Sequence, residues 1–136
     1  MKRLVLDTNV LVSGMINPFG PPGRIIDLVR EGEVTLAVDD RILSEYTEVL
    51  QRRKFRTYFS NEEVRDIAQF LAHHAYYTVP TISITDLPDP DDVPFLEVAL
   101  AAAVPLVTGN VDDFPEDRRR SVEVLTPAEY LEHFSA

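Results

Sequence analysis

The stretch Leu4-Val5-Leu6-Asp7-Thr8-Asn9-Val10-Leu11-Val12-Ser13, residues 4–13, decides the fold. Three apolar residues run into a carboxylate, and a helical pattern with Thr8 or Asn9 as its cap follows. A fully apolar strand that passes into a helix is typical of a parallel sheet covered by helices. We therefore expect a strand over residues 3–7 and a helix over residues 9–16, with Asp7 at the carboxyl end of the strand.

Two further apolar runs also end at polar residues. Residues 34–38 run into Asp39, and residues 104–107 run into Thr108. In open α/β sheets the carboxyl ends of the strands line the binding crevice. Acids gathered there repel one another unless a cation lies among them, and hard oxygen ligands favour Mg²⁺ or Mn²⁺. The pattern therefore predicts a metal-dependent enzyme.

Strand and helix patterns alternate along the rest of the chain. We expect further helices over residues 22–31, 40–53, 61–74 and 92–103 and from Thr126-Pro127 onward, and further strands over residues 34–38, 76–79, 105–108 and 122–125. Ser60 and Glu63 form a capping-box pattern, Gly32 is a stop signal, and Val122-Glu123-Val124 alternates as an edge strand does. The fold class is α/β: a three-layer α/β/α sandwich around a central parallel sheet of four to five strands, in one domain over residues 1–136.

Composition narrows the class of protein. The chain has 136 residues, 45% of them hydrophobic and 26% charged, with a net charge of −10 and no Cys. These values are ordinary for a soluble globular protein, and no apolar run is long enough to span a membrane or serve as a signal peptide. We therefore expect a cytoplasmic protein without disulfides. The negative charge limits any nucleic-acid contact to a local patch and leaves room for a basic partner.

Each candidate side chain has an ordinary explanation when it is taken alone. Asp7 fits a helix cap, and Asp92 closes the acidic run at residues 89–92 before an apolar helix. Glu45 lies just beside the apolar arc of its helix, and residues 108–113 fit a plain turn. Their joint position at or just beyond strand ends is what favours a functional site.

The same residues resemble a known family. Residues 4–13, residues 42–55 and the blocks from Asp89 to Phe114 resemble PIN-domain ribonucleases in order and spacing. The pattern is most similar to bacterial and archaeal members that are toxins of toxin–antitoxin pairs. The resemblance implies a PIN fold and hydrolysis of single-stranded RNA with Mg²⁺ or Mn²⁺. It also implies an antitoxin protein as partner and a homodimer or higher homo-oligomer.

The resemblance also implies roles for individual residues. Asp7, Glu45 and Asp92 match the first three acids of the family, whereas Asn110 stands where a fourth acid is usual. An amide ligates a cation more weakly than a carboxylate does, and Asp112 or Asp113 lies near enough to compensate. The predicted roles are catalytic for Asp7, Glu45, Asp92, Asn110 and Asp113, metal-ligating for Asp7, Glu45, Asp92 and Asp113, and orienting for Thr8, Asn9 and Thr108.

Basic residues gather in two places. Arg52, Arg53, Lys54 and Arg56 follow the third predicted helix and fit either a solvated helix end or a contact with the phosphate backbone of RNA. The run Arg118-Arg119-Arg120 is interpreted as plain surface.

Two other functions stay open at this point. Asn110 also fits a PIN-like module that binds RNA or protein without cutting. An aspartyl-phosphate phosphotransferase, with Asp7 phosphorylated, would likewise place an Asp at the end of the first strand. Such enzymes use a Lys late in the fold, and no Lys follows Lys54 here.

Overall fold

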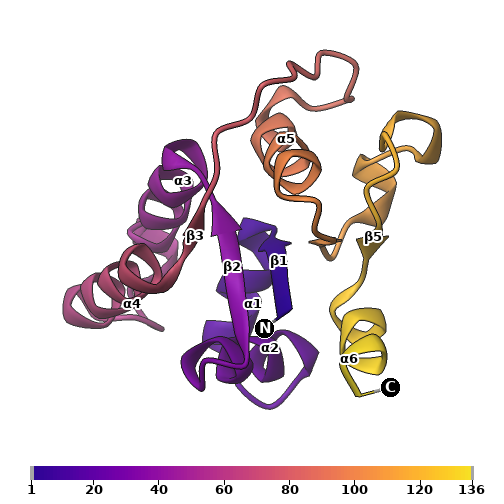
Figure 1. The fold of residues 1–136 in the computed structure, drawn as a ribbon. Coiled ribbons are helices and arrows are strands. Elements are labelled where there is room, and N and C mark those ends of the chain that lie inside the picture. The colour runs from indigo at the N-terminus through magenta and orange to yellow at the C-terminus, as the bar shows by residue number, and fades with distance from the viewer. Residues whose placement is uncertain (1, 136) are drawn as a thin grey trace.

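The computed structural model describes residues 2–135. Within these residues five strands form one sheet in the order β3-β2-β1-β4-β5, and six α-helices flank it (Figure 1). Every neighbouring pair of strands is parallel. The predicted α/β/α sandwich with a parallel sheet of up to five strands is therefore confirmed, and the segment predicted as an edge strand supplies β5 at one edge.

The elements have the following bounds. The strands are β1 (Lys2–Leu6), β2 (Val34–Val38), β3 (Tyr76–Tyr77), β4 (Leu106–Val107) and β5 (Val124–Leu125). The α-helices are α1 (Thr8–Ile16), α2 (Pro21–Arg30), α3 (Asp40–Leu50), α4 (Asn61–His74), α5 (Val93–Ala102) and α6 (Pro127–Ser135). One-turn 3₁₀ helices cover η1 (Arg53–Phe55), η2 (Pro90–Asp92), η3 (Val111–Asp113) and η4 (Glu116–Arg118). The last three strands are shorter than predicted.

The centre of the sheet is β1, which pairs with β2 on one side and β4 on the other. Its residues Leu4, Val5 and Leu6 are completely buried. Helix α5 packs against β1, β2 and β4, and α3 and α4 pack against each other and against β2. Full burial of one such aliphatic side chain contributes about 1.5–3 kcal/mol, so the apolar runs that predicted the strands also supply the core.

Local chemistry sets the helix ends. The capping box of Ser60 and Glu63 is present, and Gly32 follows α2 in the left-handed region, with φ +79. The prediction of a helix over residues 40–53 was too long. Helix α3 ends at Leu50, where its apolar face ends, and Arg52 is extended. No helix among residues 2–135 has the length and apolar character needed to cross a membrane.

Candidate active site

Asp7 leaves the central strand at its carboxyl end. It occupies the N-cap position of α1, so the prediction of Thr8 or Asn9 as cap was wrong, yet its carboxylate makes no capping hydrogen bond. Instead Asp7 Oδ2 accepts a hydrogen bond of 2.7 Å from Thr108 Oγ1. Burial raises the pKa of Asp7 above its ordinary value, and the charge of Asp113 adds to this rise. The Thr108 hydrogen bond and the backbone N–H groups of Thr8 and Asn9 act in the opposite direction and offset only part of it. Asp7 is thus available for a role other than capping.

Glu45 reaches the same edge of the sheet from α3. Its side chain is half-buried, and its Oε2 accepts a hydrogen bond from Thr8 Oγ1. Burial raises the pKa of Glu45, and the charges of Asp7 and Asp91 raise it further. The next residue fixes the helix in place, because the buried Tyr46 donates its hydroxyl proton to the carbonyl of Leu6 at 2.5 Å. The helix that carries Glu45 is therefore tied to the strand that carries Asp7.

Asp92 is the N-cap residue of α5, but its side chain makes no capping hydrogen bond. Asp89 caps the preceding 3₁₀ turn by accepting a hydrogen bond of 2.9 Å from the Asp91 amide. Asp92 Oδ2 is buried and has no hydrogen-bond partner within residues 2–135. Burial raises the pKa of Asp92 to about 7, and the charges of Asp7, Asp89, Asp113 and Glu45 contribute in that order. A buried acceptor without a donor is uncommon in folded proteins, so its presence points to a ligand.

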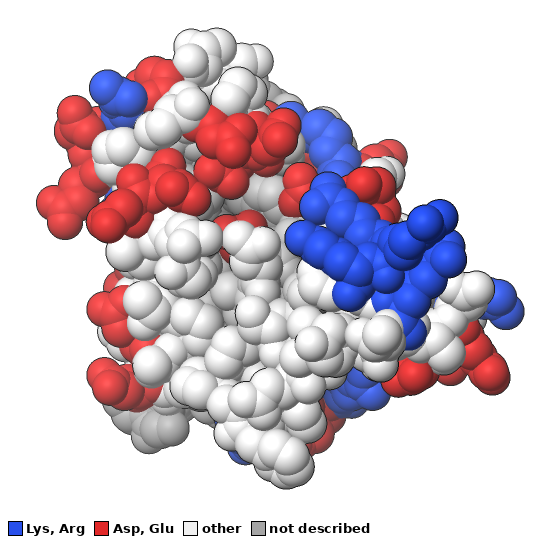
Figure 2. All heavy atoms as spheres, turned by 180° about the vertical axis from the view of Figure 1, so that it is seen from behind, with Lys and Arg blue, Asp and Glu red and all other residues white. Residues whose placement is uncertain are grey.

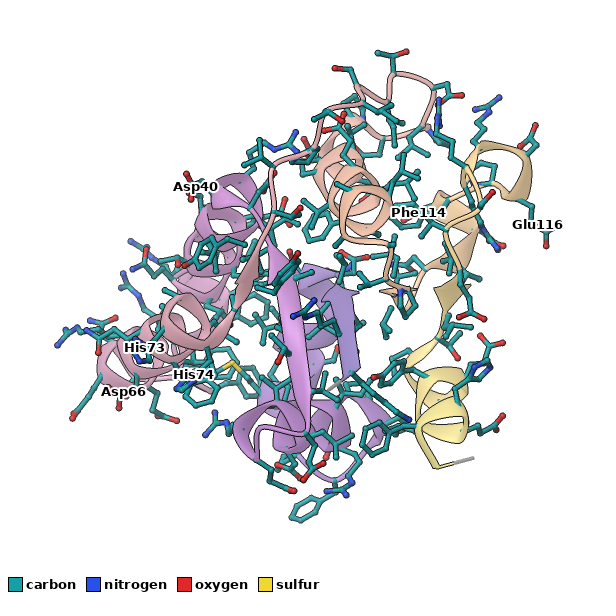
Figure 3. All side chains as sticks on the ribbon, viewed as in Figure 1. Asp40, Asp66, His73, His74, Phe114 and Glu116 are labelled. Carbon is teal, nitrogen blue, oxygen red and sulfur yellow. The ribbon has the colours of Figure 1, made fainter. Side chains whose placement is uncertain are left out.

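The fourth predicted position lies in the turn after β4. Gly109 and Asn110 do not adopt the left-handed conformation that a plain turn of these residues favours, and the Asn110 side chain is exposed. The charge of Asp113 acts on both Asp7 and Asp92, whereas that of Asp112 is not among the causes of either shift. The completely buried Phe114 lies between α5 and the chain leading to β5 (Figure 3) and anchors this turn.

The structure therefore brings four predicted acids to one edge of the sheet. These are Asp7, Glu45, Asp92 and Asp113, which act on one another through their charges. Two of the three predicted orienting residues, Thr8 and Thr108, donate hydrogen bonds to these carboxylates. The third, Asn9, has an exposed side chain that makes no hydrogen bond within the described part of the chain.

The donor set fits a hard divalent cation in chemistry. Asp7, Glu45 and Asp92 form no ion pair with any Lys, Arg or His of residues 2–135, and Asp92 Oδ2 is an acceptor without a donor. In the present side-chain conformations, no three Asp, Glu, His or Cys residues of this range are close enough to hold one ion. The carboxylates match Mg²⁺ or Mn²⁺ in atom type and charge, but three of them could share one ion only after their side chains rotate.

The predicted basic cluster lies beyond the end of α3. Arg52, Arg53, Lys54 and Arg56 are all exposed. Arg52 forms an ion pair of 3.0 Å with Glu48, and Lys54 lies over the ring of Phe55. Figure 2 shows a patch of Lys and Arg on the α3–α4 side of the molecule, beside a band of acids. His73 and His74 lie on the outer side of α4 (Figure 3), far from Phe114 and the acidic edge.

Sequence reasoning missed a buried carboxylate, Glu97. It is 8% exposed and lies on the apolar helix α5. One oxygen accepts from Arg41 Nη1 at 2.8 Å and the other from the Ile84 amide at 2.8 Å. These bonds tie the irregular segment over residues 78–89 to α3 and α5, and that segment leads to Asp92. An acid among Phe95, Leu96, Val98 and Ala99 was the signal that could have found it.

The interpretation of Arg118–Arg120 as plain surface was incomplete: Arg118 and Arg120 are exposed, but all three side chains bind groups of neighbouring segments. Arg119 donates to the carbonyls of Phe114 at 2.6 Å and Val111 at 3.2 Å, on either side of Asp113. Arg118 and Arg120 both bind Asp86, through its carbonyl and its carboxylate respectively. The run therefore fastens the turn that carries Asp113. The sequence gives no sign of these bonds because their acceptors are mostly backbone carbonyls.

Comparisons with known proteins agree with this architecture. A family model of the PIN domain matches residues 3–112. An uncharacterized protein of Methanocaldococcus jannaschii is 29% identical over an alignment of 141 positions. The alignment covers 97% of this chain and 91% of that one. A similar fold occurs in a chain of VapBC2 from Rickettsia felis, which was crystallised bound to a DNA fragment from the promoter of its own genes. The TM-score is 0.60 at 14% identity, over 91% of this chain and 98% of that one. A domain of a functionally unknown protein from Methanocaldococcus jannaschii matches with a TM-score of 0.53 at 18% identity, over 91% and 89%.

Proposed function

Because this chain belongs to the PIN domain family, whose members are generally metal-dependent nucleases, we propose that it is an endoribonuclease that uses Mg²⁺ or Mn²⁺ to hydrolyse single-stranded RNA. The observation that carries the proposal is the set of carboxylates at the end of the central strand. Asp7 is buried, Asp92 has an oxygen without a donor, and neither has a cationic partner among residues 2–135. Such a set is unfavourable unless a cation neutralises it.

The residues have distinct roles in this proposal. Asp7, Glu45, Asp92 and Asp113 would hold the metal, and Thr108 and Thr8 fix the orientation of Asp7 and Glu45 through their hydroxyl groups. A divalent cation held by these carboxylates would supply a water of lowered pKa and positive charge against the scissile phosphate. Neither a His nor a Cys nucleophile is required. Asn110, which is exposed directly before the one-turn helix Val111–Asp113, would offer its side-chain amide oxygen to the cation as a weaker, uncharged ligand.

The setting of the enzyme is part of the proposal. The sequence pattern is most similar to family members that are toxins, so we assign the chain to a toxin–antitoxin pair whose antitoxin protein silences it. The net charge of −10 favours a basic partner segment. We further propose a single nuclease domain that acts in the cytoplasm and forms a homodimer or a higher homo-oligomer.

The second candidate is a PIN module that binds RNA or protein without cutting. The observation that favours it is Asn110, an exposed amide where a fourth acid is usual in the family. Asp113 favours the nuclease instead, because its charge raises the pKa of both Asp7 and Asp92 and it can therefore serve as the fourth acid. The family match leaves the phosphotransferase without support.

Cleavage of a labelled single-stranded RNA tests the proposal. The wild type is expected to cut with Mg²⁺ or Mn²⁺ and to stop when EDTA is added. Loss of a residue that only hydrogen-bonds to a metal ligand typically lowers activity by about 10–100-fold. Asp7 is a proposed metal ligand itself, so we expect Asp7→Asn to lower the cleavage rate by more than this. The matched control is Asp66→Asn, which removes the same charge from an exposed position on α4 (Figure 3). Equal cleavage by the wild type and Asp7→Asn would end the proposal.

A further inference from the structure

A groove of about 730 Å³ runs between α3 and α4. Its floor is made by apolar side chains of both helices. Its rim carries two guanidinium groups, Arg56 and Arg65, and three side-chain amides, Gln51, Asn61 and Gln69. No Asp or Glu of residues 2–135 lines it. The charged side chains that line the groove are therefore all cationic, on a chain with a net charge of −10.

The two arginines of the groove are free to bind a ligand. Neither Arg56 nor Arg65 forms an ion pair within the described part of the chain, whereas the neighbouring Arg52 is paired with Glu48. Both side chains are exposed and line the groove between α3 and α4. An uncompensated guanidinium pair attracts phosphate groups, which it can bind bidentately.

The groove and the acidic edge share a structural element. Tyr46 lines the groove, and its hydroxyl binds the carbonyl of Leu6, the residue directly before Asp7. Glu45 precedes Tyr46 on the same helix. Tyr46 therefore lies between the groove and the end of β1 that precedes Asp7, whereas Glu45 lies on the other face of α3, against Thr8.

We propose that this groove holds a segment of the single-stranded RNA outside the metal site, an inference that rests on the proposed ribonuclease function. Arg56 and Arg65 bind backbone phosphates, and the amides of Gln51, Asn61 and Gln69 contact base edges or ribose. The apolar floor accepts the face of a base. A basic peptide does not fit, because the groove offers it two positive charges and no acid.

Fluorescence anisotropy with a short labelled single-stranded RNA tests the groove. The titration is done in EDTA, so that binding is measured without cleavage. The double variant Arg56→Gln/Arg65→Gln is expected to bind about tenfold more weakly. Loss of two phosphate contacts is also expected to flatten the slope of log K against log salt by about 1.4, since each contact to a single strand contributes about 0.7.

The matched control is Arg24→Gln/Arg30→Gln, which removes the same charge from exposed positions on α2. The proposal predicts near wild-type RNA binding for this control. It is overturned if the groove variant binds like the wild type, or if both double variants weaken binding equally, which would show a non-specific charge effect. It is also overturned if the groove variant keeps RNA binding but loses binding of a partner protein.

This outcome is separable from that of the nuclease proposal. Asp7→Asn is expected to bind the RNA in EDTA and to fail to cut it when Mn²⁺ is added. If Asp7→Asn cuts like the wild type, the proposed chemistry fails whatever the groove does. If only the groove variant fails to differ from the wild type, the groove assignment fails and the nuclease proposal stands.

Discussion

Thr108 and Asp7 are 101 positions apart in the chain, and the hydroxyl of Thr108 donates a hydrogen bond of 2.7 Å to Asp7 Oδ2. The register of the sheet explains the contact, because Leu6 pairs with Val107 and the two polar residues come one position later. The backbone N–H of Asn110 donates a hydrogen bond of 3.0 Å to the same Thr108 oxygen. The single hydroxyl proton is therefore directed to Asp7, and the Asp7 carboxylate is held in one orientation.

The first prediction concerns this hydroxyl. We expect Thr108→Val to weaken Mn²⁺ binding by about 10–100-fold, as loss of an outer hydrogen-bond partner does. The free energy of unfolding should fall by about 1–3 kcal/mol, because the Asn110 amide and Asp7 each lose a buried partner. Calorimetric titration and urea denaturation measure the two effects. Thr108→Ser, which keeps the hydroxyl, is the control, and equal metal binding by both variants would contradict the assigned role.

The second prediction concerns pH. The folded protein raises the pKa of Asp92 from an ordinary value of 3.8 to about 7, so between these values the folded state holds a proton that the unfolded state releases. The stability of the metal-free protein must then fall as the pH rises through this window and stay low above it. We expect the Tm of the wild type in EDTA to fall more steeply from about pH 5 to about pH 7 than that of Asp92→Asn. Parallel curves for the two proteins would show that Asp92 does not titrate there.

The third prediction concerns the buried Glu97. Glu97→Ala leaves the amide of Ile84, itself 3% exposed, without its acceptor. We expect a loss of about 1–3 kcal/mol in the free energy of unfolding and faster hydrogen exchange over residues 78–89. Glu97→Gln keeps an acceptor oxygen and should lose less. Unchanged exchange in Glu97→Ala would mean that Glu97 does not fasten this segment.

The fourth prediction concerns the packing of α2. A Cβ on Gly23 would lie 2.4 Å from the backbone carbon and oxygen of Pro18, which cannot move without shifting the loop before the helix. We expect Gly23→Ala to lower the free energy of unfolding by about 1–3 kcal/mol through overpacking. Gly109→Ala is the control, since a Cβ there meets nothing within 4 Å. Equal melting temperatures of the two variants would contradict the close approach.

Much of the fold could be predicted because its signals are local. The apolar run at residues 4–6, the Ser60–Glu63 capping box and the stop at Gly32 each depend on neighbours in the sequence. The predicted end of α3 was three residues too late. The residues after Leu50 are good helix formers, so the sequence gives no stop signal there, but they have no apolar face to bury.

The candidate site was predictable in its acids and less so in its supports. Asp7 comes directly after the apolar run of β1, and Asp92 comes directly before the apolar pattern of α5. The sheet topology then brings the two residues to the same edge. The choice between Asp112 and Asp113 depends on the one-turn helix over Val111–Asp113, which the sequence pattern does not predict. The bonds of Glu97 and Arg119 run to backbone groups of distant segments, so only the path of those segments reveals them.

Titration of Mn²⁺ into the metal-free protein at about pH 8, above the pKa of about 7 of Asp92, tests the central claim most directly. We predict saturable binding to the wild type and to Asp66→Asn, and binding at least about tenfold weaker to Asp7→Asn/Asp92→Asn, because the double variant loses two charged ligands. If the wild type shows no saturable binding at millimolar Mn²⁺, or if the double variant binds as tightly as the wild type, these carboxylates do not form a metal site.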